Sequence, residues 1–352
     1  MKLFNLDCHI SVIADLKKIF EDLGHSVDSW SISGHNWVFD REPTEVDIIN
    51  QNSWQHIDKD MCDNFYDRYS DELSIYDAFI CTYPISFSML YEKFKKPIIL
   101  QIPIRYETPF YNDASKWDEF NQYLRKGIDE GMIIPVANSD YDKKYFEFFV
   151  NRECELIPNI CDYTKTNWNP TINKFLYYSR LPITLNDSII DKNSLGKYKW
   201  EDIASYKGIV MIPYTCSTMS IFEYYTSNIP LFCPSKKFIC ELYEKYNNYV
   251  LSELTWNGTF RLISGSVIEC DRTRDPNDYT NINIMSEWIE YSDFYNEKWM
   301  PYITYFDSFE ELSNILDTTN IFDISKNMKE FNILRKERIY DKWDNILQNI
   351  TK

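Results

Sequence analysis

The run Met211–Pro234, MIPYTCSTMSIFEYYTSNIPLFCP, decides the fold because it predicts a strand, a polar turn, a helix and a second strand in one piece. Its apolar beginning is typical of a buried strand, and Ile221–Tyr225 predict a short helix. The segment Asn228-Ile229-Pro230 ends that helix, and Leu231-Phe232 opens the next strand. This is one repeat of a parallel α/β sheet.

The turn inside this run is rich in hydroxyl side chains, with Ser217 and Thr218 directly before the helix. The first N–H groups of a helix have no partner within it, and the helix dipole favours an anion there, so the turn predicts a phosphate site. Glu223 follows within the helix, where a carboxylate would accept hydrogen bonds from two ribose hydroxyls. The alternative is an ordinary strand-helix-strand unit with serine caps and a solvated glutamate.

The beginning of the chain repeats the same alternation. Lys2–Leu6 predicts a strand, Ile10–Leu23 has apolar residues at helical spacing, Gly24 ends that helix, and His25–Trp30 predicts a second strand. The turn after the first strand has no G-x-G-x-x-G pattern, which argues against a nicotinamide cofactor.

Further strands and helices alternate along the rest of the chain, which predicts parallel sheets covered on both faces. Strands are expected at Tyr76–Thr82, Pro97–Ile104, Met132–Ala137, Cys154–Ile157, Lys174–Ser179 and Gly208–Ile212. Helices are expected at Met89–Phe94, Phe120–Gly131, Asp140–Val150, Trp200–Tyr206, Phe238–Tyr246, Glu310–Leu316 and Ile324–Ile350. Residues 47–72 receive no assignment, and residues 251–283 fit an insertion, a lid or an acceptor loop.

Ligands of open parallel sheets bind at the carboxyl ends of strands, which makes the turn Asp7-Cys8-His9 a candidate site. A neutral imidazole at His9 has a suitable pKa to take a proton from a hydroxyl, with Asp7 or Asp40 to orient it. A helix-capping or core histidine is the alternative for His9. Next to the second strand, His35 and Trp37 offer a hydrogen-bonding group and a stacking face for an acceptor, although a plain loop is the favoured explanation for His35.

Four segments resemble motifs of the GT-B glycosyltransferases, and they occur along the chain in the same order as in that family. The interdomain serine motif is similar to Ala137-Asn138-Ser139 with Lys143, and the interdomain linker is similar to Ile157–Asp162. The strand that opens the second domain is similar to Phe175–Leu181, and the donor-binding segment is similar to Met211–Pro234. We identify the chain as similar to families 4 and 1 of these enzymes. Its Tyr-, Asn- and Ile-rich style resembles chains from large DNA viruses or AT-rich bacteria.

The resemblance implies an α/β protein of GT-B fold, with two Rossmann-like domains whose parallel sheets face a central cleft. We expect an N-terminal acceptor domain at residues 1–158 and a C-terminal nucleotide-sugar donor domain at residues 159–325. Residues 326–352 are expected to form a helix that crosses back to the first domain. Arg180, Ser217 and Thr218 would hold the diphosphate and Glu223 the ribose, while His9 with Asp7 would be catalytic. Arg105, at the end of a strand, is expected beside the acceptor with His35 and Trp37.

The implied activity is transfer of a sugar from a UDP- or GDP-type donor to a hydroxyl of a glycan or glycoprotein, with no cofactor and no metal. Retaining relatives have a glutamate eight positions before Glu223, where this chain has Thr215, so inversion by direct displacement is expected. Two other functions stay open, a sugar-nucleotide epimerase of the same fold and a non-catalytic glycan-binding protein.

Length and composition are consistent with this. The 352 residues suit two domains, and the net charge of −17 argues against nucleic acid and anionic lipid as partners. The nine Cys, with no C-x-x-C pair, indicate reduced thiols. No signal peptide or membrane-spanning run is recognisable, so we predict a cytoplasmic protein, in the host cytoplasm if the chain is viral.

Overall fold

The computed structural model describes residues 1–352 except 184, 253–271, 279–280 and 351–352. The chain forms two compact units. The first comprises Met1–Asn159 together with the C-terminal residues from Ile339 onward, and the second comprises the described residues from Ile160 to Arg338.

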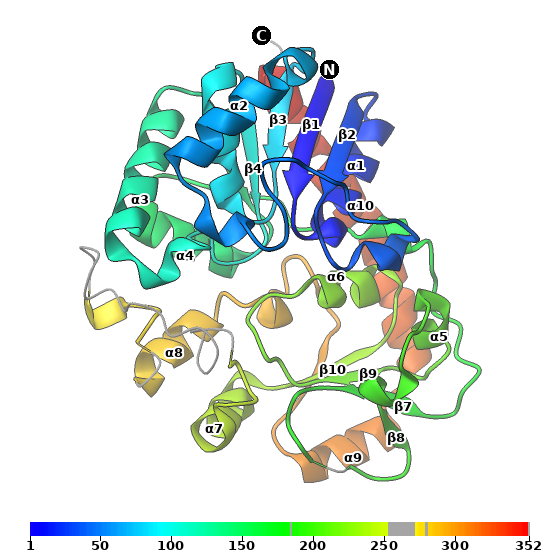
Figure 1. The fold of residues 1–352 in the computed structure, drawn as a ribbon. Coiled ribbons are helices and arrows are strands. Elements are labelled where there is room, and N and C mark those ends of the chain that lie inside the picture. The colour runs from blue at the N-terminus through cyan, green and yellow to red at the C-terminus, as the bar shows by residue number, and fades with distance from the viewer. Residues whose placement is uncertain (184, 253–271, 279–280, 351–352) are drawn as a thin grey trace. The chain divides into compact units, whose positions relative to one another are not determined.

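The first unit is built on a six-stranded sheet in the order β2-β1-β3-β4-β5-β6, with every pair parallel. Its strands are β1 (Lys2–Asp7), β2 (Ser26–Ser31), β3 (Ala78–Cys81), β4 (Ile98–Ile102), β5 (Ile133–Ala137) and β6 (Glu155–Leu156). All residues of β3 and β4 are buried, as expected for strands with helices on both faces. In Figure 1, α2 lies in front of this sheet.

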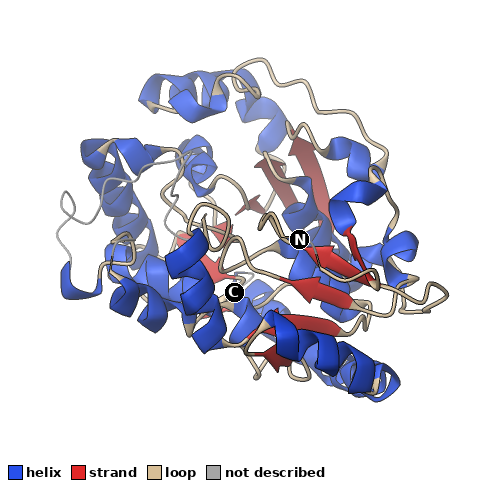
Figure 2. Cartoon of the chain, turned by 90° about the horizontal axis from the view of Figure 1, so that it is seen from below, coloured by secondary structure: helices blue, strands red, loops and turns tan. Residues whose placement is uncertain are grey.

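The second unit has a five-stranded parallel sheet in the order β11-β10-β9-β7-β8. Its strands are β7 (Phe175–Tyr178), β8 (Ile189–Asp191), β9 (Ile209–Met211), β10 (Leu231–Pro234) and β11 (Thr304–Phe306). Figure 2 shows the strands of the chain in red among blue helices. The predicted α/β class with two parallel sheets is therefore confirmed.

Eight of the nine expected helices are present in the described part of the chain, together with two that were not expected, α2 and α8. They are α1 (Ile10–Asp22), α2 (Lys59–Leu73), α3 (Ala114–Asp129), α4 (Asp140–Val150), α5 (Trp200–Ala204), α6 (Met219–Thr226), α7 (Lys236–Tyr246), α8 (Ile282–Ile289), α9 (Phe309–Thr318) and α10 (Ile321–Ile350). The predicted bounds of α4 are confirmed at both ends. Helix α3 begins six residues before its predicted start at Phe120, because Asp113 caps it through the N–H of Lys116.

Three-residue and longer 3-10 turns complete the chain. They are η1 (Asn36–Phe39), η2 (Trp54–His56), η3 (Ile85–Phe94), η4 (Phe110–Asn112), η5 (Asp162–Thr164), η6 (Lys192–Leu195), η7 (Arg272–Arg274) and η8 (Asp293–Tyr295). The predicted α-helix at Met89–Phe94 is instead part of η3, which begins after the cis peptide bond Tyr83-Pro84. Among the described residues, no helix combines the length and the apolar character needed to cross a membrane.

The strand order of each sheet reverses at one place. In the first sheet β2 lies on one side of β1 and β3 lies on its other side. In the second sheet β8 and β9 lie on opposite sides of β7 in the same way. Loops at the carboxyl ends of two such strands diverge and leave a crevice between them, which is where open parallel sheets bind ligands. Each unit therefore has one position predicted for a ligand by topology alone.

Candidate functional site

In the first unit, His9 lies at the reversal point between β1 and β3. It follows β1 and precedes α1, and its residue is exposed to solvent. The neighbouring loop after β3 meets it there: the N–H of Cys8 donates to the carbonyl oxygen of Tyr83 at 2.7 Å. The rings of His9 and Tyr83 stand edge to face, with their centroids 6.3 Å apart.

The electrostatic surroundings keep the His9 ring neutral. Protein atoms around the ring displace water although part of the residue remains accessible, and this desolvation lowers the pKa of His9. The charge of His35 lowers the pKa further, while the backbone of His9 itself opposes the change. A neutral imidazole at neutral pH is the form that accepts a proton.

Asp7 lies beneath this turn and holds its backbone. Its Oδ1 accepts one hydrogen bond from the N–H of His9 and another from the hydroxyl of Ser31, both at 2.8 Å. Asp7 is fully buried, and burial raises its pKa to about 7. The carboxylate thus contacts the backbone of His9 instead of the imidazole, so it fixes the turn without selecting the ring's tautomer.

The loop that carries His35 is connected to the same carboxylate. The hydroxyl of Ser31 also accepts from the N–H of Ser33, at 3.4 Å, and the hydroxyl of Ser33 accepts from the N–H of His35 at 3.1 Å. His35 is exposed directly before η1, and Trp37 within η1 is 49% exposed. The histidines at the ends of β1 and β2 are therefore positioned by one chain of hydrogen bonds.

Arg105 differs from its expected role. Its side chain is 2% exposed, its Nε donates to Oε1 of Glu107 at 2.8 Å, and its guanidinium lies 4.5 Å from the ring centroid of Tyr145. The hydroxyl of Tyr145 donates to the same oxygen of Glu107 at 3.0 Å. The guanidinium of Arg105 is therefore not exposed to an acceptor. A position at the end of a strand determines at which edge of the sheet a residue lies, but it does not determine the direction of its side chain.

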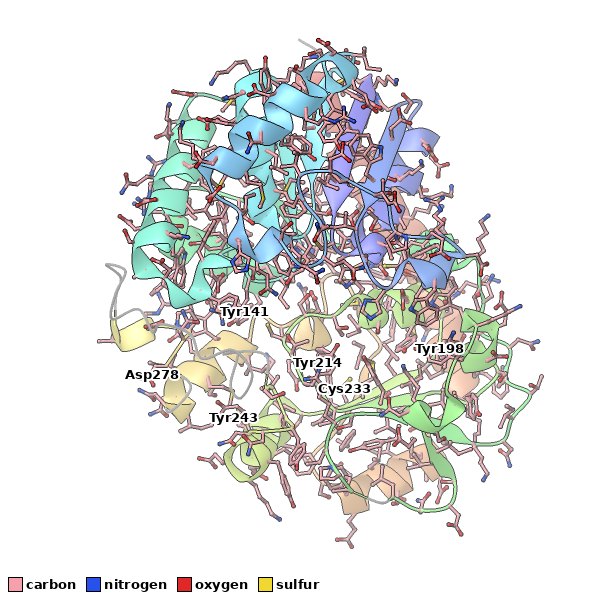
Figure 3. All side chains as sticks on the ribbon, in the orientation of Figure 1. Tyr141, Tyr198, Tyr214, Cys233, Tyr243 and Asp278 are labelled. Carbon is pink, nitrogen blue, oxygen red and sulfur yellow. The ribbon has the colours of Figure 1, made fainter. Side chains whose placement is uncertain are left out.

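In the second unit, Arg180 lies at the reversal point between β7 and β9. It is exposed after β7, and its guanidinium carbon lies 4.0 Å from the ring centroid of Tyr214, which follows β9. The Lys192 ammonium lies between the rings of Tyr178 and Tyr198, 4.4 and 4.5 Å from their centroids. Tyr198 and Tyr214 are labelled in Figure 3. Two cations and several aromatic rings thus lie near the carboxyl ends of β7, β8 and β9.

The loop before α6 is held by residues from far along the chain. The hydroxyl of Ser217 donates to Oδ2 of Asp293 at 2.8 Å, and both residues are buried. The hydroxyl of Ser292 and the N–H of Asp293 donate to the carbonyl oxygen of Cys216, at 2.6 and 3.2 Å. Ser217 therefore shapes the loop through its side chain, a contact that the sequence did not predict because 76 residues separate the partners.

Several helices begin with a side-chain cap, but α1, α5 and α6 have N-cap residues whose side chains do not cap. A side-chain oxygen caps the N-termini of six helices, namely Asp58 for α2, Asp113 for α3, Ser139 for α4, Ser235 for α7, Asn281 for α8 and Ser308 for α9. The N-cap residues of α1 and α6 are His9 and Thr218, and neither side chain caps its helix. Helix α1 follows β1 and α6 follows β9, so each begins beside a reversal point, and its first N–H groups can bind an anion.

Glu223 projects from α6 and is half-buried. Its Oε1 accepts a hydrogen bond of 2.7 Å from the hydroxyl of Tyr163, which lies in η5. The ring of Tyr163 stands edge to face with Trp200, with centroids 5.6 Å apart. The sequence predicted Glu223 but gave no signal for Tyr163, since only the fold brings η5 to this helix.

The far end of α6 is bound by α10. The side-chain amide of Asn332 donates to the carbonyl oxygen of Tyr225 at 2.9 Å, and the buried guanidinium of Arg335 donates to the hydroxyl of Thr226 at 3.0 Å. A cation at a helix C-terminus interacts favourably with the helix dipole. Helix α6 is thus held by contacts at both ends, which fixes the position of Glu223.

Part of the predicted site lies outside the described residues. Most of residues 251–283, considered for an insertion, a lid or an acceptor loop, belongs to 253–271 and 279–280. Within the remainder of the chain, no group of three or more His, Cys, Asp or Glu side chains is arranged to hold a metal ion. Metal independence stays a prediction.

Solved structures support the fold. HepE of Anabaena, determined in complex with UDP and glucose, is similar with a TM-score of 0.52 at 9% identity, covering 99% of this chain and 100% of that one. The fold is GT-B. Two further solved structures align over nearly the whole chain, the kitacinnamycin glycotransferase and CalG4, the calicheamicin glycosyltransferase, at 9% and 10% identity with TM-scores of 0.45 and 0.41.

The kitacinnamycin enzyme covers 98% of this chain and 97% of its own, and CalG4 covers 100% and 99%. No protein-family model matches the sequence. No curated protein matches it either. The GT-B likeness is therefore one of structure, at an identity that speaks to the fold alone.

Proposed function

We propose that the protein is a glycosyltransferase that transfers a sugar from a UDP- or GDP-type donor to a hydroxyl of a glycan or glycoprotein, with inversion and without a metal. The observation that carries this proposal is the carboxyl edge of the second sheet. There the uncapped N-terminus of α6 follows Thr218, Arg180 lies at the reversal point, and Glu223 is fixed by Tyr163.

These groups suit the parts of a nucleotide diphosphate. The first N–H groups of α6 and the guanidinium of Arg180 would bind the diphosphate, because both offer positive charge at a strand end. The Glu223 carboxylate would accept hydrogen bonds from ribose hydroxyls. Ser217 would act indirectly, by holding the loop through Asp293.

The first unit would supply the acceptor side of the reaction. Neutral His9 would take the proton of the acceptor hydroxyl as its oxygen forms a bond to the anomeric carbon of the donor sugar. The bond from that carbon to the diphosphate breaks, and the diphosphate leaves with the electron pair. Positive groups near the leaving oxygen stabilise the charge that develops there. His35 and Trp37 would contact the acceptor.

Nucleotide binding is the direct test. A ligand that binds only the folded state raises the melting temperature by mass action, so UDP, GDP, CDP, dTDP and ADP are compared by thermal shift with and without EDTA. UDP comes first because HepE was determined with it. A selective shift that EDTA does not change supports the proposal, and no shift with any nucleotide contradicts it. Hydrolysis or epimerisation of the donor in the absence of an acceptor would indicate a different reaction at the same site.

A further inference from the structure

A cavity lies in the first unit, away from the carboxyl edge of its sheet. It is open to solvent, has a volume of about 540 Å³ and is lined by residues of α2, η3 and α3 and by Lys95. This volume is within the range of about 300–1,000 Å³ that is usual for small-molecule sites. His9 follows the carboxyl end of β1, whereas Lys95 and Lys126 in the cavity wall precede the amino ends of β4 and β5. The cavity is therefore separate from the candidate catalytic residue.

Four lysines line this cavity, in a chain whose net charge is −17. Lys59 and Lys93 share one carboxylate, that of Asp63, at 3.1 and 2.9 Å. Lys95 and Lys126 have no ion-pair or hydrogen-bond partner within the described part of the chain. Besides Asp63, one more carboxylate, that of Glu92, faces the cavity. Four positive and two negative groups leave the wall with an excess of two positive charges.

Backbone geometry places two of these cations. Lys126 lies in the last turn of α3, and Lys95 follows η3 in the left-handed region, with φ of 54°. A non-glycine residue in that region is uncommon, and it turns the chain so that Lys95 joins the wall instead of extending η3. Unpaired lysines bind phosphate as point charges when they converge on one space.

The floor of the cavity is less polar than its rim. Met89 contributes a flexible thioether, and Tyr123 is half-buried with its hydroxyl oxygen inaccessible to solvent. Burial raises the pKa of Tyr123, and a hydrogen bond with the hydroxyl of Ser88 opposes this rise, so the two buried hydroxyls face each other. The ring of Tyr123 and the side chain of Met89 therefore offer apolar surface to the body of a ligand.

We propose that this cavity binds a small organic phosphate, with its phosphate on Lys95 and Lys126 and its apolar body on Met89 and Tyr123. The site binds its ligand independently of the nucleotide-sugar reaction. The ligand is a phosphomonoester with an aromatic or aliphatic group, because inorganic phosphate alone leaves the apolar floor empty.

The test observes Met89 directly. Protein with ¹³C-labelled methionine methyl groups is titrated with phenyl phosphate, and the Met89 signal is assigned from its loss in Met89→Leu. We expect a saturable shift of that signal with phenyl phosphate, and weaker binding of inorganic phosphate and of benzyl alcohol. The double variant Lys95→Gln/Lys126→Gln should bind phenyl phosphate about tenfold more weakly, because two charge-assisted contacts are lost.

A matched control variant distinguishes binding in the cavity from general attraction of phosphate to surface lysines. Lys116 on α3 and Lys144 on α4 belong to the same unit but do not line the cavity, so Lys116→Gln/Lys144→Gln should bind as the wild type does. The proposal is overturned by an unsaturable or absent shift, by equal weakening in both double variants, or by benzyl alcohol binding as tightly as phenyl phosphate. Displacement of phenyl phosphate by UDP would also overturn it, since the site would then belong to the nucleotide.

Discussion

Ser31 donates a hydrogen bond of 2.8 Å to Asp7, its register partner at the end of the neighbouring strand. The same oxygen of Asp7 accepts from the N–H of His9, so one buried carboxylate joins the ends of β1 and β2 to the turn that presents the candidate base. The other oxygen, Oδ2, is buried and has no hydrogen-bond partner among the described groups. Only one of the two carboxylate oxygens of Asp7 therefore accepts hydrogen bonds, and the buried surroundings solvate its ionised form poorly.

This arrangement predicts a pH-dependent stability. Burial raises the pKa of Asp7 to about 7, whereas an unfolded aspartate titrates near pH 4 (about 3.9). Between these values the folded state holds a proton that the unfolded state has lost, so the free energy of unfolding falls as the pH rises toward 7 and then levels. Asp7→Asn has no such proton, and its stability relative to the wild type should increase by about 2–3 kcal/mol from pH 5 to pH 8.

Urea unfolding at the two pH values measures this difference. Asp142, whose pKa burial also raises to about 7, titrates in both proteins and cancels in the comparison. Asp60→Asn, at an exposed position on α2, is the control and should follow the wild type. Parallel pH profiles for Asp7→Asn and the wild type would show that Asp7 is ionised in the folded protein.

Replacement of His9 should separate chemistry from donor binding. His9→Ala removes the proposed base, so transfer to the acceptor should fall at least about 100-fold, the usual contribution of general base catalysis, while nucleotide affinity stays within about twofold because α6 and Arg180 are unchanged. Since the pKa of His9 is lowered, kcat/KM of the wild type should be level near pH 7 and decline only below pH 6.5. His56→Ala, at another exposed histidine, is the control, and full activity of His9→Ala would reject the assignment.

The uncapped start of α6 predicts opposite effects on stability and binding. Thr218→Asp supplies a capping carboxylate and should stabilise the protein by about 1 kcal/mol, but its charge would repel the diphosphate and weaken nucleotide binding about tenfold or more. Thr218→Ser provides a neutral cap of similar size for comparison. Denaturant unfolding and calorimetric titration measure the two quantities, and tighter nucleotide binding by Thr218→Asp would exclude this helix as the diphosphate site.

Glu223 should discriminate between ribose and deoxyribose. Loss of a hydrogen bond to a charged group costs about 1.5–3 kcal/mol, so Glu223→Gln should weaken binding of the preferred nucleotide about tenfold. The wild type should bind the 2′-deoxy nucleotide less tightly than the ribonucleotide, and the variant should lose most of that preference. Glu241→Gln on α7 is the control. An unchanged preference in Glu223→Gln would place the ribose elsewhere.

Arg105 and Glu107 should act on stability together. Arg105→Ala leaves the Glu107 carboxylate buried without its main partner and should lower the free energy of unfolding by about 3–5 kcal/mol. Arg105→Met/Glu107→Leu removes both charges and should recover most of this loss, because an apolar pair needs no compensation. If the double variant is as unstable as the sum of the single ones, the two residues are not coupled.

The sequence predicted regular elements well where periodicity and caps agreed, as in α4 between Ser139 and Asn151. It did not predict α2, because this helix has only a narrow apolar stripe, Cys62, Phe65, Tyr69 and Leu73, among charged residues. Likewise, strand ends indicated the edge at which Arg105 lies, but its burial depends on Glu107 and Tyr145. Side-chain direction requires the tertiary contacts.

Hydrogen bonds between residues far apart in the sequence could not be predicted from the sequence either. Tyr163 is 60 residues from Glu223, and Asp293 is 76 residues from Ser217. No local period or motif links such pairs, since a hydrogen bond of this kind depends on the packing of whole elements. The uncapped N-terminus of α6 was also not predictable, because threonine is a frequent N-cap and only the geometry shows that Thr218 does not cap.

Helix α10 has a consequence for how the chain is synthesised. Its last part belongs to the first unit, where Trp343 packs edge to face on Phe20 with ring centroids 5.1 Å apart, and Tyr340 donates to Asp22 at 2.7 Å. The ribosome makes these residues only after the whole second unit. The unit that is translated first therefore completes its core last, and until α10 has left the ribosome Phe20 remains without its aromatic partner.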